Sequence, residues 1–238
     1  MSPLGVLFTA LGYATGIAVF WIAGRKAGWT PRQLAWLLVA ALAGGVFGAK
    51  LTQWLVLGWP FSAPLAAIGD PLQGGKTILG GIVCGWIAVE AMKMLLRVRR
   101  STGDLFAIAL PAGEAVGRFG CLFNACCYGA ESLVPWAVWQ HGAWRHPAQL
   151  YASLAALAVL VVLFGLRGRL WREGDLFRAY LVLYGAGRFG VEFFRVHDRL
   201  YAGLSLAQWV SLELALAGAV ALWLSAWAAT RAQSKRGV

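Results

Sequence analysis

Seven long runs of apolar residues constrain the fold of this chain more than any other feature. They cover residues 5–23, 33–57, 77–95, 105–122, 148–166, 176–193 and 204–229. A transmembrane helix needs about 20 mostly apolar residues, and each run comes close to that length. No long linker divides them. The sequence therefore predicts an all-α, polytopic membrane protein with about seven transmembrane helices, forming a single domain over residues 1–238.

The charge of the chain excludes a soluble protein and changes how its basic residues are interpreted. Only 13% of the residues are charged, whereas a soluble domain carries roughly 25%. The net charge of +11 would favour a nucleic-acid partner in a soluble protein. Here the basic residues lie in short blocks between apolar runs, so we expect no nucleic-acid partner. The blocks instead indicate membrane topology and attraction to anionic lipid headgroups.

These basic blocks predict the orientation of the chain in the membrane. They follow the first, third, fifth and seventh apolar runs, as in Arg25-Lys26 and Lys235-Arg236. The positive-inside rule then places the N-terminus outside and the C-terminus in the cytoplasm, which requires an odd number of spans. The two longest connections, 58–76 and 123–147, fall on the outer side. Both contain tryptophan and proline, and the run 136–139 could be extended.

Two arginines lie deep within apolar runs. Burying one arginine at the bilayer centre costs at least about 2.5–3.5 kcal/mol, so each needs a partner or a purpose. Counted from the cytoplasmic side at 1.5 Å per residue, Arg118 lies about 21 Å and Arg188 about 18 Å into the membrane. Their matching depth predicts a phosphate clamp, because the planar guanidinium binds phosphate oxygens bidentately and stays charged.

An alternative interpretation is that each arginine is neutralised within its own helix. Glu114 lies four residues before Arg118, and Glu192 lies four residues after Arg188, and such pairs face each other on a helix. A transporter with a buried ion network would show the same pattern. The arginines alone therefore leave both hypotheses open.

The sixth apolar run places three polar groups on one helical face. Tyr184, Arg188 and Glu192 recur at four-residue spacing, and Phe193, Phe194 and Arg195 follow. A phenol, a guanidinium and a carboxylate in line could hold a phosphate headgroup and polarise a proton.

Further polar residues stand where the second outer loop enters the fifth run: His146, Gln149 and Tyr151. A histidine at this interface is more often a snorkelling polar residue than a base, and both interpretations stay open.

The four cysteines, Cys84, Cys121, Cys126 and Cys127, contain no C-x-x-C pair and form no disulfide framework. The last three could form a metal site, or the redox site of a quinone-linked thiol oxidase. We favour packing residues near the outer interface, because no ligand set is complete. We therefore expect no metal and no cofactor.

Several sequence strings together resemble the bacterial prolipoprotein diacylglyceryl transferases. They are Gly117-Arg118-Phe119-Gly120-Cys121-Leu122-Phe123-Asn124, ending at Gly129; His146-Pro147-Ala148-Gln149-Leu150-Tyr151; Tyr184, Arg188 and Glu192 with Phe193-Phe194-Arg195; and, more weakly, Gly80-Gly81. Their order spans about residues 74–210. Each string alone is weak, but the ordered set on a seven-span frame is fairly specific.

The resemblance implies an enzyme of the bacterial inner membrane with its active site toward the outer leaflet. The family transfers diacylglyceryl from phosphatidylglycerol to the lipobox cysteine thiol of a preprolipoprotein, the first step of lipoprotein modification. A thioether forms and glycerol phosphate leaves. The implied partners are therefore phosphatidylglycerol as donor, a lipobox peptide as acceptor, and membrane lipid.

The resemblance also implies roles for individual residues. The arginines would hold the phosphate and stabilise the leaving group, while the acceptor thiol, with a pKa of about 8.5, needs help to ionise. Which group gives that help stays open among Tyr184, Glu192 and His146. The catalytic set is Arg118, Arg188, Tyr184, Glu192 and His146; the substrate-binding set is Arg118, Gly120, Asn124, Gly129, Gln149, Tyr151 and Arg195.

The chain departs from the family pattern at four positions. Leu79 replaces a histidine, Cys121 an asparagine, Cys126 an acidic residue and Ala152 a glutamate. The predicted phosphate-binding residues are retained, while several acceptor-side groups are not. The sequence thus predicts a divergent member whose lipid donor is better supported than its acceptor, and a related transferase with another acceptor remains an alternative.

Overall fold

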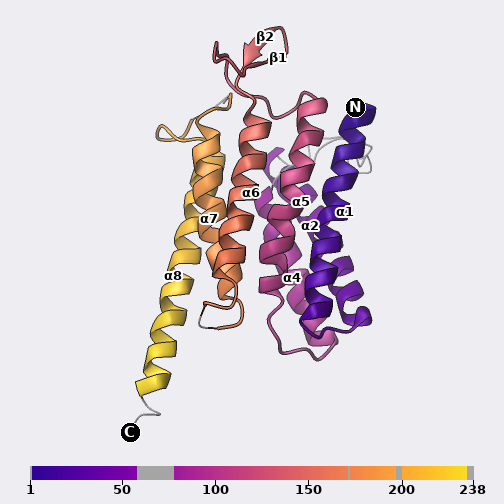
Figure 1. The fold of residues 1–238 in the computed structure, drawn as a ribbon, viewed down its shortest axis with the longest axis vertical. Helices are drawn as coiled ribbons and strands as arrows, with labels where there is room; N and C mark the ends of the chain where they lie inside the picture. The colour runs from indigo at the N-terminus through magenta and orange to yellow at the C-terminus, as the bar shows by residue number, and fades with distance from the viewer. Residues whose placement is uncertain (1, 58–77, 171, 197–199, 235–238) are drawn as a thin grey trace. The chain divides into compact units, whose positions relative to one another are not determined.

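The computed structural model describes residues 2–57, 78–170, 172–196 and 200–234. Seven α-helices lie in these ranges, and each matches one predicted run with small differences at its ends (Figure 1). They are α1 Pro3–Lys26, α2 Pro31–Leu57, α4 Ile78–Leu95, α5 Gly103–Phe123, α6 Ala148–Leu166, α7 Asp175–Glu192 and α8 Leu206–Ser234. The outer connection predicted at 58–76 lies outside the described residues.

The helices have the length and surface of membrane spans. Five of them, namely α1, α2, α5, α6 and α8, are long and apolar enough to cross a bilayer. Large apolar side chains are exposed on them, including Val46, Leu154 and Trp223, and lipid is the solvent that suits such a surface. The prediction of a polytopic helical membrane protein is confirmed at this level. Seven spans and their orientation stay predictions.

The chain divides into two compact units, which are described separately. One comprises Gly24–Arg100, and the other comprises Met1–Ala23 with Ser101–Val238. In the first unit α2 packs directly on α4, because glycines at four-residue spacing remove side chains from the contact. A Cβ on Gly44 would lie 2.7 Å from the backbone oxygen of Cys84. The single domain predicted from the sequence stays a prediction.

The second unit places α5, α6 and α7 against one another, with α8 packed on α7 (Figure 1). Glycines again set the close crossings. A Cβ on Gly12 of α1 would lie 2.7 Å from the Cα of Gly117 on α5. A Cβ on Gly185 of α7 would lie 2.5 Å from the Ser211 oxygen on α8. These contacts hold the helices that carry the predicted site residues.

A β-hairpin in the loop between α5 and α6 was not predicted. Strand β1, Val138–Gln140, pairs antiparallel with β2, Ala143–Arg145. The two turn residues, His141 and Gly142, have φ of 52° and 76°, as a type I′ turn requires. Three-residue strands are too short for alternation to reveal them, so the sequence indicated only an extended run at 136–139. The all-α prediction therefore needs this addition.

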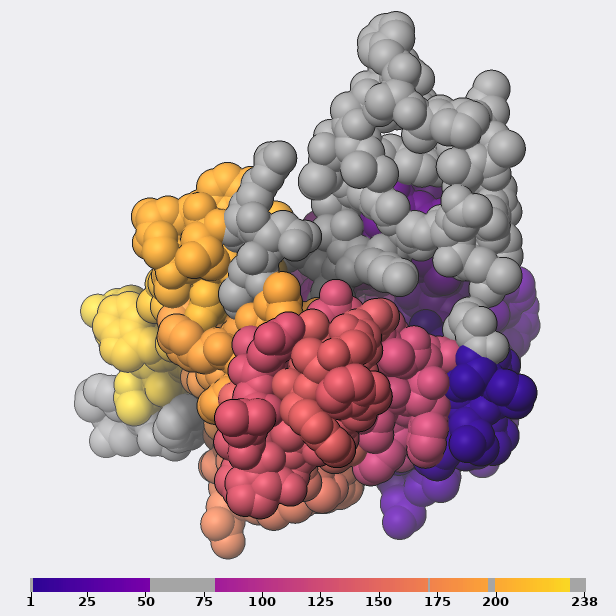
Figure 2. All heavy atoms as spheres, turned by 90° about the horizontal axis from the view of Figure 1, so that it is seen from above, coloured from indigo at the N-terminus to yellow at the C-terminus, as the bar shows by residue number. Residues whose placement is uncertain are grey.

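The hairpin loop covers one end of its own unit. Figure 1 shows the hairpin beyond the N-terminal end of α6. Figure 2, seen from above, shows the rose-to-salmon atoms of this loop next to the orange atoms around the end of α7. One backbone hydrogen bond joins these segments, because the Ala130 amide donates to the Phe194 oxygen at 2.8 Å, and a second, from the His146 amide to the Ala130 oxygen, lies within the loop. The loop is therefore fastened to the helix that carries Arg188.

Candidate functional site

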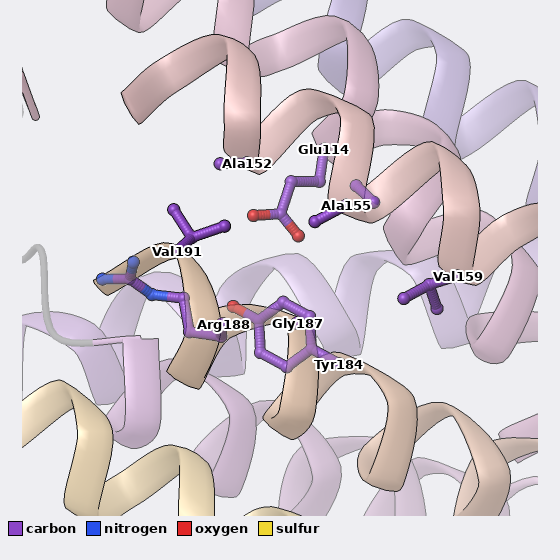
Figure 3. A pocket seen from close by; sticks show the side chains of 9 residues that line it. Glu114, Ala152, Ala155, Val159, Tyr184, Gly187, Arg188 and Val191 are labelled. Carbon is purple, nitrogen blue, oxygen red and sulfur yellow. The ribbon is translucent and has the colours of Figure 1, made fainter. Parts of the chain in front are cut away.

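A small cavity of about 20 Å³, partly open to the surroundings, lies among α5, α6 and α7. Polar side chains enter it from two sides. Figure 3 shows Glu114 entering from one side, with Tyr184 and Arg188 on the other. The remaining lining is apolar and consists of Ala152, Ala155, Ala156, Val159, Gly187 and Val191.

Small residues on one face of α6 create the space. Ala152, Ala155, Ala156 and Val159 recur at three- and four-residue spacing, so they share a face of the helix. None of them reaches far across the gap toward α7. The Ser153 hydroxyl donates to the Ala115 carbonyl oxygen at 2.5 Å and ties α6 to α5. The cavity thus follows from short side chains on a helix that is held in place.

Arg118 is paired with Glu114 one turn earlier on α5. Its Nε donates to Glu114 Oε1 at 2.9 Å, and its Nη2 contacts the same oxygen. Both side chains are mostly buried, and Glu114 lines the cavity. The contacts use the Nε–Nη2 edge of the guanidinium, so the Nη1 side faces away from Glu114.

Arg188 and Arg195 share a single carboxylate on α7. Glu192 Oε2 lies 2.5 Å from Arg188 Nη1 and 3.4 Å from Arg195 Nη1. The Ser205 hydroxyl lies 3.4 Å from Glu192 Oε1, and Glu192 is only 4% exposed. Arg188 is also within electrostatic reach of Arg118 and Tyr184.

This arrangement answers the question that the sequence left open. The two predicted pairs, Glu114 with Arg118 and Arg188 with Glu192, are confirmed. They do not neutralise the site, because Arg195 shares Glu192 and adds one positive charge in excess of the two carboxylates. An excess positive charge in a poorly solvated region attracts an anion strongly. Pairing within each helix and binding of an anion are therefore compatible.

His146 and Tyr151 belong to an aromatic cluster outside the cavity lining. Tyr151 Oη accepts a hydrogen bond from Trp136 Nε1 at 2.6 Å and lies 3.1 Å from His146 Nδ1. The ring of Phe194, just beyond α7, packs edge-on against both His146 and Tyr151, with centroids 5.2 Å apart in each case. The structure thus places the candidate base in the loop between α5 and α6.

Gly129 lies where this loop meets the end of α7. It forms an isolated β-bridge with Arg195. A Cβ at this position would lie 2.7 Å from the Phe194 carbonyl oxygen and would also collide with that of His146. Only glycine fits between these backbone groups, so Gly129 allows the close contact between the loop and α7.

The other predicted substrate-binding residues contact protein groups. Gly120 packs against α1, where a Cβ would lie 2.9 Å from the Gly5 oxygen. The Asn124 side-chain oxygen accepts a hydrogen bond from the Ser2 amide at 3.0 Å. Gln149 is buried and donates to the Cys126 carbonyl oxygen at 2.8 Å. None of the three is among the residues that line the described cavity.

Three cysteines lie together at the C-terminal end of α5. The sulfur atoms of Cys121, Cys126 and Cys127 are all within 4.8 Å of one another, and we call them the cysteine cluster. Thiol hydrogen bonds from Cys121 and Cys126, and the nearby charges of Arg195 and Arg118, lower the pKa of Cys127. The cluster therefore favours one thiolate beside two arginines.

Sequence reasoning missed two parts of the site. It treated Glu114 only as a counter-ion, although Glu114 lines the cavity. It also overlooked the face of α6 formed by Ala152, Ala155 and Ala156. The signal for that face was present, since small residues at helical spacing next to a run of polar motifs leave room between helices.

The apolar helices define a membrane-embedded protein, and a network of arginines and glutamates lies beside its largely apolar cavity. Comparison with known sequences agrees: the chain belongs to the prolipoprotein diacylglyceryl transferase family, whose model matches residues 4–224. The resemblance inferred from the motifs is thereby confirmed, and so is the prediction of a membrane transferase enzyme.

Individual relatives are similar over most of their length, and each carries the name phosphatidylglycerol–prolipoprotein diacylglyceryl transferase. The protein of Methylibium petroleiphilum is 33% identical, over 98% of this chain and 95% of its own. That of Finegoldia magna is 32% identical, over 91% and 88%. That of Bordetella parapertussis is 31% identical, over 92% and 90%.

Proposed function

We propose that this protein transfers the diacylglyceryl group of phosphatidylglycerol to the lipobox cysteine thiol of preprolipoproteins. The observation that carries the proposal is the set of three arginines, Arg118, Arg188 and Arg195, that share two glutamates; of this set, Arg188 and Glu114 line the cavity. The names of the relatives support the same two substrates. Membership of a transferase family favours an enzyme over a carrier with buried counter-ions.

The arginines are assigned to the phosphate of the lipid donor. The phosphodiester carries one negative charge and becomes a dianion when the bond from the diacylglyceryl carbon to oxygen breaks. Arg118 and Arg188 would stabilise this added charge, which is worth more in a poorly solvated site than in water. The apolar face of α6 would take the glycerol backbone and the first carbons of the chains.

On the acceptor side, the thiolate sulfur attacks the diacylglyceryl carbon that is bonded to the phosphate oxygen. A thioether forms and glycerol phosphate leaves. Tyr184 lines the cavity. We therefore assign to its phenol the role of polarising a proton next to the phosphate of the lipid donor. Glu192 is held between two arginines and would position them. His146, with Tyr151, would orient the acceptor in the outer loop.

We further propose that the protein resides in the bacterial inner membrane with its active site toward the outer leaflet. The alternating basic blocks support an outside N-terminus, a cytoplasmic C-terminus and seven spans in one transferase domain. The hairpin loop and the cysteine cluster would then face the compartment in which exported lipoprotein precursors arrive.

The full chain in nanodiscs tests the proposed reaction. Discs containing phosphatidylglycerol are incubated with a lipobox peptide, and the expected result is a peptide that gains the mass of one diacylglyceryl group. A peptide with serine in place of the lipobox cysteine should gain nothing, and discs of phosphatidylcholine alone should be much less active. If folded protein gives no diacylated peptide with several lipids and peptides, the proposed function is wrong.

A second candidate is the same lipid chemistry with a different acceptor. It is favoured by the replacement of family residues by Leu79, Cys121 and Cys126. This candidate predicts turnover of phosphatidylglycerol without any modified lipobox peptide. Comparing the lipids and lipoproteins of cells with and without the gene separates the two acceptors.

A further inference from the structure

The backbone conformation at the end of α5 brings the residues of the cysteine cluster together. Helix α5 ends in a Schellman motif: the Cys126 amide donates to the Cys121 oxygen at 3.0 Å, and the Ala125 amide donates to the Leu122 oxygen at 3.1 Å. Ala125 has the left-handed φ of 49° that this motif requires. The motif turns the chain back, so that Cys126 returns to Cys121.

A second left-handed residue completes the turn. Cys127 has a φ of 59°, which is uncommon outside glycine, asparagine and aspartate. Its sulfur joins the other two within 4.8 Å. Two successive departures from ordinary backbone conformation thus gather three sulfur atoms at one point. Such strained positions persist where the surrounding structure holds them, and they concentrate at functional sites.

The surrounding loop is fixed by side-chain hydrogen bonds. Gln149 donates to the Cys126 carbonyl oxygen at 2.8 Å and to Gln140 Oε1 at 3.1 Å. Gln140 in turn donates to the Leu122 carbonyl oxygen at 3.2 Å. Both glutamines are buried. The cysteine cluster is therefore pre-organised, as a ligand set must be if binding is not to cost much ordering of the chain.

The spacing, charge and access of the cluster suit a thiophilic cation. Tetrahedral zinc at about 2.3 Å from each sulfur needs sulfurs about 3.8 Å apart, which small rotations can reach from the observed separations. Three thiolates would leave a zinc complex with one negative charge. Arg118 and Arg195 lie within electrostatic reach of Cys127 to balance it. All three cysteines are partly exposed, so the sulfurs are accessible.

We propose that Cys121, Cys126 and Cys127 form a three-thiolate site for a divalent thiophilic ion, Zn²⁺, whose fourth position takes the acceptor thiol. The sequence offered a metal site as the less favoured alternative to packing, and the proximity of the three sulfur atoms now supports that alternative. Three protein ligands with one open position are the usual pattern of catalytic zinc. The second half of the proposal rests on the proposed function.

The ion would supply the step that the acceptor needs. The incoming thiol loses its proton to solvent on coordination and is held as a thiolate beside the phosphate-binding arginines. Its sulfur lone pair attacks the diacylglyceryl carbon, the carbon–oxygen bond breaks, and glycerol phosphate leaves with the electron pair. No oxidant or reductant takes part. The ion remains bound to the three cysteines.

Cobalt binding tests the site without any reference to activity. The full chain is purified with a non-thiol reductant, stripped with a chelator and titrated with Co²⁺, which reports thiolate ligands by charge-transfer absorption in the near ultraviolet. Wild type is expected to bind one equivalent, displaced by Zn²⁺. The matched control Cys84→Ser retains the cluster and should bind like wild type.

Substitution of the cluster decides the outcome. The triple variant Cys121→Ser, Cys126→Ser, Cys127→Ser should lose the charge-transfer band, and each single serine variant should bind more weakly. The single variants cover the case in which the triple variant fails to fold. Retention of the full band in the triple variant, or the absence of any band in wild type, would overturn the site.

The acceptor role has its own readout in the lipidation assay. A thiol with a pKa of about 8.5 is only about 3% ionised at pH 7, so stripping the ion should slow lipidation by about 10- to 30-fold. Added Zn²⁺ should restore it in wild type and in Cys84→Ser, but not in the triple variant. The deficit should shrink as the pH rises above 8.5, where the free thiol ionises unaided.

The cobalt titration and the lipidation assay together distinguish failure of the metal site from failure of the proposed function. Cobalt bound by the cluster with no lipidated peptide under any condition means that the proposed function fails and the metal site stands. Lipidation that is unchanged by stripping means that the ion plays no part in acceptor activation. Lipidation with no cobalt band overturns the whole inference.

Discussion

At the scale of single residues, the sharing of Glu192 determines what the site can bind. One carboxylate between Arg188 and Arg195 leaves each guanidinium only partly satisfied, and the second carboxylate is taken by Arg118. On the proposed function, the donor phosphate would form charge-assisted hydrogen bonds without first breaking a complete ion pair. Neutralising all three arginines would have made the same helices a poor anion site.

Replacing either central arginine by lysine tests this arrangement. Arg118→Lys and Arg188→Lys keep the charge but lose the planar fork. We expect each to reduce diacylglyceryl transfer by about 100-fold or more, as the loss of a preorganised transition-state donor does. The measurement is peptide lipidation in nanodiscs, with protein insertion quantified in parallel.

A matched control is Arg169→Lys, because Arg169 lies on the exposed turn after α6. It should insert and act like wild type. Near-normal turnover in either Arg118→Lys or Arg188→Lys would exclude the bidentate clamp and return the arginines to a structural role.

At the scale of secondary-structure elements, the contact between the outer loop and α7 depends on Gly129. Gly129→Ala places a methyl group against two backbone oxygens, those of His146 and Phe194, which cannot rotate away. We expect about a tenfold or greater loss of transfer activity together with lower thermal stability. Thermal unfolding and lipidation of the same preparation check both effects.

The control for that substitution is Gly165→Ala near the end of α6, where nothing lies within 4 Å of the added methyl. Alanine should be neutral or stabilising there, because it favours a helix more than glycine. Equal effects at positions 129 and 165 would show that the loop contact has no special importance.

The end of α5 offers a second test at this scale. Ala125 holds a left-handed conformation that costs about 1–2 kcal/mol outside glycine. Ala125→Gly removes this strain. Glycine also raises the conformational entropy of the unfolded chain, which offsets part of the stabilisation, so we expect a net stabilisation of about 0.5–1 kcal/mol. The unfolding midpoint in detergent measures it.

The same chemical change elsewhere should have the opposite sign. Ala10 is exposed in the middle of α1, so Ala10→Gly should destabilise by about 1 kcal/mol. A shift in the same direction at both positions would mean that the conformation of Ala125 does not determine its response.

The helices could be predicted from the sequence, since apolar run length alone located all seven in the described residues. Their ends were less accurate, because helical hydrogen bonding continues past the last apolar residue. The run predicted at 5–23 belongs to a helix that extends to Lys26, and the run ending at 229 extends to Ser234. Charged residues near the end of an apolar run lower the hydropathy there, although the helix itself continues through them.

The site could be predicted only in part, for a physical reason that differs by residue. The pairs on α5 and α7 followed from four-residue spacing. Arg195 was predicted to bind substrate, but its ion pair with Glu192 was not, because Arg195 reaches Glu192 through the turn that follows α7. The cysteine cluster was considered only as the less favoured alternative, since its assembly depends on a left-handed alanine where sequence rules expect glycine.

At the scale of the whole molecule, the prediction that matters most is orientation. Fusion of alkaline phosphatase at the His141-Gly142 turn should give active enzyme, and a fluorescent protein fused at the C-terminus should fluoresce. Both follow from an outside loop and a cytoplasmic C-terminus. The reverse pair of results would invert the topology and place the cavity and loop toward the cytoplasm.

The alanine face of α6 has a consequence for how selective the molecule can be. Alanine has no side-chain rotamers, so this wall of the cavity loses no rotational freedom when a ligand arrives and cannot swing aside to admit a larger one. Its width is set by helix backbones. Two added carbon atoms, as in Ala155→Val, would narrow the space without altering any charge. Ligand size and ligand charge are thus controlled by different helices and can change independently.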